Sequence, residues 1–490
     1  MSELLASLSR FGAFQALVIG DFMLDELVHG DASRLSPDVP VPVLRVERTE
    51  RSGGGASNVA SCMAWLGGLV NCCGVIGGDT AGAHLQRSLE QSGCAVTGLV
   101  VDADRPTTVK QGLVGLAQDR HRHKMFRLDI ESDAPLSSTT SEAIDARIEE
   151  LIEGVQVVCI EDYGKGVCSD NRCRKVMALA AKRGLPVMVD PASCDDYSRY
   201  RGATVMTPNR TEAKRVCQGL AGSPESPEDM AVALLELLEL DAIVITLDRH
   251  GALLLERGGT PEMVPTIPRD VYDVSGAGDM VLAALAAGRA HDLCWRDCVV
   301  LANAAAGLEV EVFGAQPIAL SRVVQEVVRM TTSQEGKVRS REALTLELAA
   351  HRDAGHRVVL TNGCFDVIHA GHVAYLRDAR DHGDVLVVGV NVDTQVHAMK
   401  GQGRPVYSLD DRMAILSELA CVDFVVAFDE PTAHALIDEM RPDLYVKGGD
   451  YAPDQVNEYE HVRSLGIECR VLAHRPGLGS TDVVDHLRNC

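Results

Sequence analysis

The sequence predicts two α/β domains in tandem, each built on a doubly wound, mainly parallel sheet. Three observations indicate this fold class. The chain has 490 residues, more than one ordinary domain core contains. Short runs rich in Val, Ile and Leu alternate with segments of helical period along nearly the whole chain, as in βαβ units. A polar interruption, TTSQEGK at 331–337, divides these runs into two series.

The first series contains five apolar runs that we expect to be strands and two clear helical segments. The strands are expected at 16–21, 157–162, 186–191, 203–209 and 242–248, and the helices at 171–184 and 228–240. Two alternating stretches, 41–48 and 109–130, interrupt this rhythm. They predict a small, more exposed β-sheet attached to the main body.

The second series begins with RVVLTNG, which ends at Gly363. Its further strands are expected at 384–391, 423–429, 443–450 and 468–473. About 150 residues suffice for one doubly wound domain. We therefore expect a first domain over residues 1–330, a linker over 331–340 and a second domain over 341–490.

Composition excludes several classes of function. The net charge is −23, whereas a general binder of nucleic acid or of anionic membranes needs a basic surface. The 15 cysteines form no CxxC pair, which indicates a reducing compartment. The first residues lack the features of a signal peptide, and no run approaches the ~20 apolar residues of a membrane span. We expect a cytoplasmic protein that binds neither nucleic acid nor membrane.

The stretch VYDVSGAGDMVLAALAAG, at 271–288, carries the strongest signal of the first domain. A glycine-rich turn, Ser275 to Asp279, opens a long apolar helix. Backbone N–H groups at such a helix start converge on anions, and the helix dipole favours negative charge there. Asp279 would then accept the proton of an attacking hydroxyl. The alternative is an ordinary turn in which the aspartate only complements the helix dipole.

Two stretches of the first domain suit a sugar. Asp21 and Asp25 follow a strand and could accept hydrogen bonds from hydroxyl groups. Gly54 and Gly55 precede Asn58 and an alanine-rich helix, which allows a sugar to approach the backbone closely. A solvated strand end and a plain strand-to-helix turn are the alternatives. In TPNRTE, at 207–212, an asparagine and a glutamate lie one helical turn apart, which also describes a polar helix cap.

Together these motifs resemble the ribokinase-like (PfkB) family of sugar kinases over residues 10–318. The resemblance implies a doubly wound domain with a β-lid, ATP and Mg²⁺ as cofactors, and Asp279 as the catalytic residue. It also implies a nucleotide and magnesium motif and an anion hole, formed by Asn209, Arg210, Thr211, Glu212, Gly276, Ala277 and Gly278. The sequence contains no Walker A motif, so P-loop kinase chemistry is excluded. Ala192 stands where the family commonly has lysine, and Ser275 where it has threonine.

The stretch TNGCFDVIHAGHVAYL, at 361–376, places two histidines at the start of a helix. His369 and His372 enclose Ala370 and Gly371. Surface polarity or a metal pair would be the simple alternatives, but a metal pair normally has i, i+4 spacing and a third ligand. Nucleotidyl transfer explains the pattern better, because two imidazoles at a helix start can donate to the charge that develops on an attacked α-phosphate.

Further polar residues follow other strands of the second series, where a doubly wound fold binds its ligands. Those expected to contact nucleotide or phosphate are Gly363, Phe365, Lys400, Arg404, Arg412, Lys447, Ser480 and Thr481. Each one separately could be a solvated charge or a helix cap. With the two histidines they resemble the cytidylyltransferase-like nucleotidyltransferases over residues 340–490.

The order of the two domains resembles the family of bifunctional enzymes of ADP-heptose synthesis. This resemblance implies phosphorylation of D-glycero-β-D-manno-heptose 7-phosphate at O1. A separate phosphatase would then remove the 7-phosphate, and AMP would pass from ATP to heptose 1-phosphate, giving ADP-heptose and pyrophosphate. It implies ATP in both domains, Mg²⁺, heptose phosphates as partners, a homodimer through the lid, and no direct structural metal site. There are three alternatives: the same two reactions on another sugar phosphate, the use of CTP in place of ATP, and a scaffold protein with one inactive domain.

Overall fold

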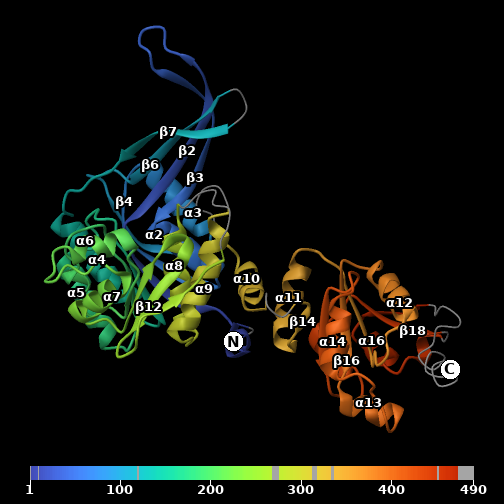
Figure 1. The fold of residues 1–490 in the computed structure, drawn as a ribbon. Helices are drawn as coiled ribbons and strands as arrows, with labels where there is room; N and C mark the ends of the chain where they lie inside the picture. Colours follow the sequence, from blue (N-terminus) through green and yellow to red (C-terminus); the bar gives the residue numbers. More distant parts are fainter. Residues whose placement is uncertain are drawn as a thin grey trace. The chain divides into compact units, whose positions relative to one another are not determined.

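The computed structural model describes residues 2–8, 10–117, 121–267, 275–311, 317–332, 336–449 and 452–472. The chain divides into two compact units (Figure 1). One unit contains residues 10–326, and the other contains residues 327–490 together with residues 1–9. Helix α10 (Leu320–Thr332) crosses this division and ends inside the predicted linker, 331–340, which also contains the short strand β14 (Val338–Arg339).

The first unit is built on a nine-stranded sheet. Its strand order is β13-β12-β11-β10-β9-β8-β1-β4-β5, and all neighbours from β11 to β5 are parallel, whereas β12 and β13 run antiparallel at one edge. The central strand β1 is apolar on both faces because helices cover the sheet on both sides, and residues 16–20 are buried. The strands are β1 (Phe14–Gly20), β4 (Gly68–Gly77), β5 (Ala95–Asp102), β8 (Val157–Glu161), β9 (Val187–Asp190), β10 (Val205–Met206), β11 (Ala242–Thr246), β12 (Ala252–Glu256) and β13 (Glu262–Val264).

Helix α8 is the central helix of this unit. Every residue from Asp279 to Gly288 is buried, because the helix is apolar all round and packs against α2 and α9 as well as the sheet. The helices and 3₁₀ turns of the unit are α2 (Ala56–Trp65), α3 (Thr80–Gln91), α4 (Ser138–Leu151), α5 (Asp170–Ala181), η1 (Ser198–Tyr200), α6 (Arg210–Cys217), α7 (Pro227–Leu238), η2 (Asp248–His250), α8 (Ala277–Ala290) and α9 (Trp295–Glu309).

A separate four-stranded sheet forms a lid, with the order β3-β2-β6-β7. Figure 1 shows it projecting away from the nine-stranded sheet. Its strands are β2 (Phe22–Leu35), β3 (Pro42–Gly55), β6 (Thr108–Ala117) and β7 (His121–Ile130). The prediction of a small exposed sheet from residues 41–48 and 109–130 is thereby confirmed. The sequence did not predict β2, which runs directly on from β1 into the lid.

The second unit is a six-stranded parallel sheet with the order β14-β17-β16-β15-β18-β19. Helices α11, α15 and α16 share one apolar cluster with one face of the sheet, and α12 and α14 share another with the opposite face. This is the predicted doubly wound arrangement. Its strands are β14 (Val338–Arg339), β15 (Val358–Gly363), β16 (Val385–Asn391), β17 (Phe424–Phe428), β18 (Leu444–Gly448) and β19 (Glu468–Leu472). Its helices and 3₁₀ turn are α1 (Ser2–Leu8), α11 (Arg341–Asp353), α12 (Ala370–Arg380), α13 (Asp393–Lys400), α14 (Leu409–Ser417), α15 (His434–Met440), η3 (Pro453–Gln455) and α16 (Tyr459–Ser464).

Within the described ranges, no helix combines the length and the apolar character that crossing a membrane requires.

Candidate active sites

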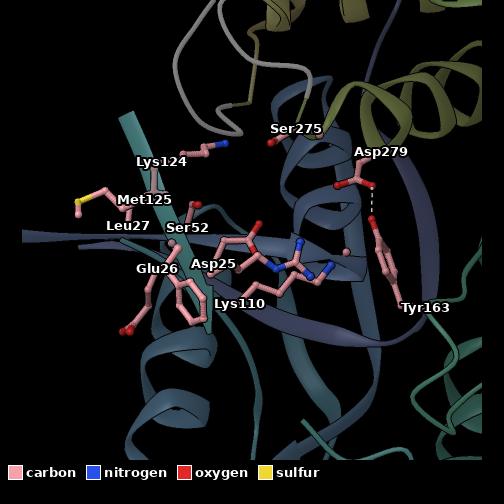
Figure 2. A pocket seen from close by; sticks show the side chains of 15 residues that line it. Asp25, Glu26, Leu27, Ser52, Lys110, Lys124, Met125, Tyr163, Ser275 and Asp279 are labelled. Carbon is pink, nitrogen blue, oxygen red and sulfur yellow. Dashed lines mark hydrogen bonds between the residues drawn. The ribbon is translucent and has the colours of Figure 1, made fainter. Parts of the chain in front are cut away.

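A pocket of about 490 Å³ lies between the lid and the start of α8 (Figure 2). Its walls bring together lid residues and the glycine-rich turn that the sequence singled out. The lining residues are Asp25, Glu26, Leu27, Ser52, Gly55, Lys110, Gly112, Lys124, Met125, Phe126, Arg127, Tyr163, Ser275, Gly276 and Asp279.

Asp279 lies at the inner wall of this pocket and is only 5% exposed. The Nδ2 atom of Asn58 donates a hydrogen bond of 2.8 Å to its Oδ2, and the Tyr163 hydroxyl lies 3.5 Å from its Oδ1. Burial raises the pKa of Asp279 to about 7, although the bond from Asn58 favours the ionised form. A carboxylate of this kind suits a general base near neutral pH.

Gly276 explains how the turn presents Asp279. It precedes α8 with φ 90°, a left-handed conformation that a glycine adopts without strain. The chain can therefore turn sharply into the helix, and the N–H groups of the first turn, which includes Ala277 and Gly278, have no partners within the helix. Ser275 and Gly276 line the pocket beside them. The residues predicted to form an anion hole thus lie next to Asp279.

The two predicted sugar-binding aspartates lie in different surroundings. Asp25 lines the pocket, and a Cβ atom on Gly54 would lie 2.7 Å from its carboxyl group, so only glycine leaves room for it. Asp21 instead accepts bonds from the backbone N–H groups of Tyr163, Lys165 and Val167, at 2.9, 3.0 and 3.4 Å. It is outside the residues that line the pocket, and its contact with sugar stays a prediction.

The predicted nucleotide and magnesium motif forms the start of α6. The Asn209 side chain accepts bonds from the N–H groups of Thr211 and Glu212, and Glu212 accepts one of 3.0 Å from the N–H of Asn209. Arg210 is the first residue of the helix. The motif is therefore a complete capping box, as the alternative interpretation of this stretch expected. Glu212 is also close enough to Asp190 to raise the pKa of that carboxyl group.

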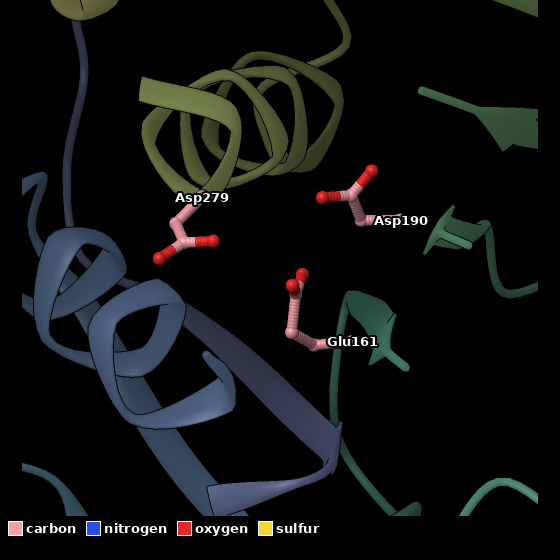
Figure 3. Close-up of side chains that lie close together, drawn as sticks. All are labelled: Glu161, Asp190 and Asp279. Carbon is pink, nitrogen blue, oxygen red and sulfur yellow. The ribbon is translucent and has the colours of Figure 1, made fainter. Parts of the chain in front are cut away.

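Asp279 belongs to a group of three carboxyl groups (Figure 3). Oxygen atoms of Glu161, Asp190 and Asp279 all lie within 4.8 Å of one another. Burial raises the pKa values of Glu161 and Asp190 well above their usual range, and repulsion by neighbouring carboxylates raises them further: Asp190 and Asp279 act on Glu161, and Glu212 and Asp279 act on Asp190. One Glu161 oxygen is buried without a hydrogen-bond partner among the described residues.

In the second unit, the two histidines lie together at the start of α12. His369 is the N-cap residue, and its Nδ1 accepts a bond of 3.2 Å from the N–H of Gly371. The ring centroids of His369 and His372 are 4.0 Å apart, and the Phe365 ring lies 5.5 Å from that of His372. Phe365 has φ 47°, a strained conformation for a non-glycine residue, directly before the motif.

A second pocket of about 390 Å³ opens at the carboxyl ends of the parallel strands. Gly363 at the end of β15 and Lys447 in β18 line it, whereas the two histidines do not. Lys447 Nζ donates a bond of 3.3 Å to the carbonyl oxygen of Asn362, and burial lowers the pKa of this lysine. The further lining residues are Asn362, Asn391, Met399, Phe428, Pro431, Thr432, Ala433, Gln455, Val456, Asn457 and Glu458.

Of the four cations predicted to bind nucleotide or phosphate in the second unit, only Lys447 lines this pocket. Arg404 pairs with the buried carboxylate of Asp366, and Lys400 is exposed at the end of α13. Arg412 is completely buried. It donates to the carbonyl oxygens of Cys364, Asn391 and Tyr407 and to the Asp393 carboxylate. No contact of Arg412 among the described residues tests whether it binds phosphate, so that role stays a prediction. Ser480 and Thr481 lie outside the described residues.

Comparison with known proteins assigns both units to known families. The pfkB family of carbohydrate kinases matches residues 15–321, and the cytidylyltransferase-like family matches residues 360–483. The "Bifunctional protein HldE" of Geotalea uraniireducens is 38% identical over 99% of this chain and 98% of its own length. That of Azotobacter vinelandii is 40% identical over 98% of this chain and 99% of its own length. The chain belongs to the bifunctional HldE family. It joins a sugar kinase to a nucleotidyltransferase, as the motifs predict.

Solved structures show the fold of the kinase half. Phosphofructokinase-2 from Escherichia coli, in complex with substrates and products, aligns with a TM-score of 0.54 at 18% identity. The alignment covers 65% of this chain and 99% of that one. Ribokinase from Thermotoga maritima aligns with a TM-score of 0.50 at 20% identity, over 64% of this chain and 99% of that one. The ribokinase-like fold with its lid is thereby confirmed.

Sequence reasoning missed several residues of this HldE-family kinase site. Glu161 and Asp190 are the last residues of β8 and β9, both of which were expected as strands, so their meeting at one sheet edge could have been anticipated. Tyr163 follows directly in EDYGKG. The Lys110 ammonium lies over the Tyr163 ring, 4.1 Å from its centroid. Lys110 and Arg127 line the pocket and belong to the alternating stretch 109–130, whose basic residues could have indicated a site for an anionic substrate.

Proposed function

We propose that the kinase domain phosphorylates D-glycero-β-D-manno-heptose 7-phosphate at O1, and that the second domain transfers AMP from ATP to heptose 1-phosphate. The products of the two steps are the 1,7-bisphosphate with ADP, and ADP-heptose with pyrophosphate. The position of Asp279 carries this proposal. Its buried carboxylate lines a pocket that also contains a helix start for phosphate and a cationic lid.

In the kinase step, the sugar hydroxyl lies against Asp279 and gives its proton to the carboxylate as it attacks the γ-phosphate of ATP. Asn58 holds Oδ2 of Asp279 at 2.8 Å, so Oδ1, which has only the longer 3.5 Å contact with Tyr163, is the freer oxygen for that proton. The N–H groups at the start of α8 bind the transferred phosphate. Asp25 accepts hydrogen bonds from the sugar.

Three lid cations support a substrate that is itself phosphorylated. Lys110, Lys124 and Arg127 line the pocket and each lowers the pKa of Asp25, whose net pKa burial nevertheless raises. A neutral sugar needs no such group of cations. A sugar phosphate would bring a dianion to them, and guanidinium and ammonium groups are the usual protein partners of phosphate.

The residues behind Asp279 suit Mg²⁺. Magnesium prefers carboxylate oxygens together with substrate phosphates, and Glu161 offers a buried oxygen without a protein partner. Glu161, Asp190 and Glu212 would hold the ion, which neutralises phosphate charge when bound. Asp279 is left as the base.

In the adenylyl transfer step, His369 and His372 donate to the oxygens of the attacked α-phosphate, and the start of α12 adds its positive end. The pocket beside Lys447 receives the rest of the nucleotide. The anomeric phosphate made by the kinase is the nucleophile here, after a separate phosphatase has removed the 7-phosphate.

The proposal includes a homodimer through the lid and a cytoplasmic location. Phe126, Leu128 and Ile130 of β7 are 64%, 42% and 51% exposed, which is more apolar surface than one solvated strand normally presents. Every described cysteine carries a free thiol, in keeping with a reducing compartment.

Two single substitutions test the assignment of both sites. We expect Asp279→Asn to abolish kinase turnover while adenylyl transfer to supplied heptose 1-phosphate persists, because the base is lost from one domain only. His372→Ala should abolish adenylyl transfer while kinase turnover persists. Products are identified by mass spectrometry from heptose 7-phosphate and ATP, with and without a phosphatase. Loss of both activities in either folded variant would show that the sites are not independent.

A further inference from the structure

A second carboxyl group lies behind the kinase base, in the interface of α2, α8 and α9. Glu309 is the last residue of α9 and is 1% exposed. Both of its oxygens are buried, and no described donor reaches either with the geometry of a full hydrogen bond. A buried polar group in this state is costly, so it requires an explanation.

The surroundings of Glu309 connect it to the active site. The groups that act on it are the Asp279 carboxylate of α8 and the Asn58 amide of α2. The Cys62 thiol of α2 is close enough for Glu309 to raise its pKa, second to burial. Among the described residues, no cation is placed to neutralise the Glu309 carboxyl group. Asn58 therefore separates two carboxyl groups, and it donates its 2.8 Å bond to the one that serves as the base.

Three influences keep Glu309 uncharged at neutral pH. Burial raises its pKa, the nearby Asp279 charge raises it further, and the Asn58 amide only partly opposes them, so that the pKa reaches about 8. Its place at the carboxyl end of α9 acts in the same direction, because the helix dipole disfavours an anion there. The two carboxyl groups thus differ in surroundings: Asp279 accepts the hydrogen bond of Asn58, which favours its ionised form, whereas neither oxygen of Glu309 accepts one from a described residue.

We propose that Glu309 is a positioning residue of the kinase: its uncharged carboxyl group packs behind Asn58 and lets the Asn58 amide hold Asp279 in place to accept the proton of the sugar hydroxyl. This inference rests on the proposed role of Asp279 as the base. When Glu309 ionises, its carboxylate competes with Asp279 for the amide hydrogens of Asn58. It also repels the Asp279 carboxylate. The kinase therefore loses activity as the pH rises through the range in which Glu309 titrates, while the second domain does not.

Glu309→Gln tests this inference, because glutamine has the same size and stays uncharged at every pH. We expect the variant to match wild-type kinase kcat at pH 7 within about twofold. At pH 9 roughly one tenth of Glu309 keeps its proton, so wild-type kcat should fall by about tenfold whereas the variant should not. Infrared difference spectra between pH 7 and pH 9 should contain, in the wild type, one more protonated carboxyl band than in Glu309→Gln, because the signal of Asp279, whose pKa is about 7, is common to both.

Thermal unfolding gives a second measurement that does not depend on turnover. A carboxyl group with a raised pKa holds a proton in the folded state that the unfolded chain releases, so it makes the domain less stable as pH rises from about 4.5 to about 8. The Glu309→Gln kinase domain should therefore melt at a higher temperature than wild type at pH 9, and the difference should shrink at pH 5. Glu309→Leu, which is also uncharged, should behave in the same way.

The controls separate this inference from the proposed function. Glu326→Gln removes another buried carboxyl group and should leave the alkaline loss of activity intact. Adenylyl transfer in the same samples should not change. A folded Glu309→Gln enzyme that loses kinase activity at pH 9 as wild type does would overturn the role of Glu309. If the wild-type enzyme does not phosphorylate heptose 7-phosphate at any pH, the proposed function is what fails.

Discussion

At the scale of single residues, Gly54 shows how closely the kinase pocket is built around one carboxylate. A Cβ atom at this position would lie 2.7 Å from the Cγ and both oxygens of Asp25, well inside van der Waals contact. The neighbouring chain is a paired lid strand and offers little room for movement. Asp25 can therefore occupy the pocket only because residue 54 has no side chain.

We expect Gly54→Ala to displace Asp25 and to lower kcat/KM for the sugar by roughly 10- to 100-fold, since a hydrogen bond to a charged group contributes about 1.5–3 kcal/mol. Steady-state kinetics with varied sugar and saturating ATP measure this loss. Gly12→Ala is the matched control, because nothing lies within 4 Å of a Cβ atom there. Unchanged sugar kinetics in Gly54→Ala would remove Asp25 from the sugar site.

Single residues also differ in whether their place in the site can be predicted from the sequence. Asp279 and the two histidines were predictable because each motif is local: a turn, a helix start and the reacting group are adjacent in sequence. Glu309 and Asn58 are 251 positions apart, and nothing in either segment indicates that α2 and α9 bring the two residues together beside Asp279. The complete burial of Arg412 was not anticipated for a related reason, because arginine is almost always exposed; its contact with phosphate stays a prediction.

At the scale of elements, Arg412 connects segments of the second unit that lie near the pocket beside Lys447. It lies on α14 (Leu409–Ser417) and reaches the turn after β15, the end of β16 and the start of α13. A buried guanidinium group stabilises these segments only when all of its hydrogen bonds are present together. Removing it leaves carbonyl oxygens and a carboxylate without their donor.

We expect Arg412→Met to lower the free energy of unfolding of the second domain by about 3 kcal/mol or more, since breaking a buried charge network is strongly destabilising. Denaturant unfolding of that domain measures the loss. The exposed Arg463→Ala should have little effect, because surface charges contribute little. Kinase activity should persist in both variants. A second domain of normal stability in Arg412→Met would contradict this account.

The elements themselves were largely predictable. Buried parallel strands such as β1 and β8 are continuous apolar runs, and the lid strands alternate, so their sequence patterns differ visibly. Strand β2 was missed because FMLDELVHGDASRL contains four charged residues and has no continuous apolar run. It is stabilised instead by pairing with β3 on one side and β6 on the other, which depends on residues distant in sequence.

At the scale of the whole molecule, each catalytic centre lies within one compact unit. The first unit contains Asp279 and all residues that line its pocket, and the second contains both histidines and the pocket beside Lys447. Each unit also has its own sheet and its own apolar clusters. Among the described residues, each pocket is lined by residues of its own unit alone.

We expect separate fragments of residues 1–335 and 336–490 to fold, the first with kinase activity and the second with adenylyltransferase activity. The reason is that the cut lies outside every described helix and strand. Assays of each purified fragment, together with its thermal unfolding, measure the outcome. Residues 1–9 group with the second unit, so a fragment of residues 10–335 serves as the comparison. Aggregation of both pieces would show that the units share a core.

The partners of Arg412 also indicate which sequence positions can vary among members of this family. Three of its four partners are main-chain carbonyl oxygens, which every amino acid supplies. Positions 364, 391 and 407 are thus able to drift among relatives without disturbing the contacts, whereas position 412 is not. An aligned set of HldE proteins should therefore contain one invariant arginine whose neighbours in space vary freely.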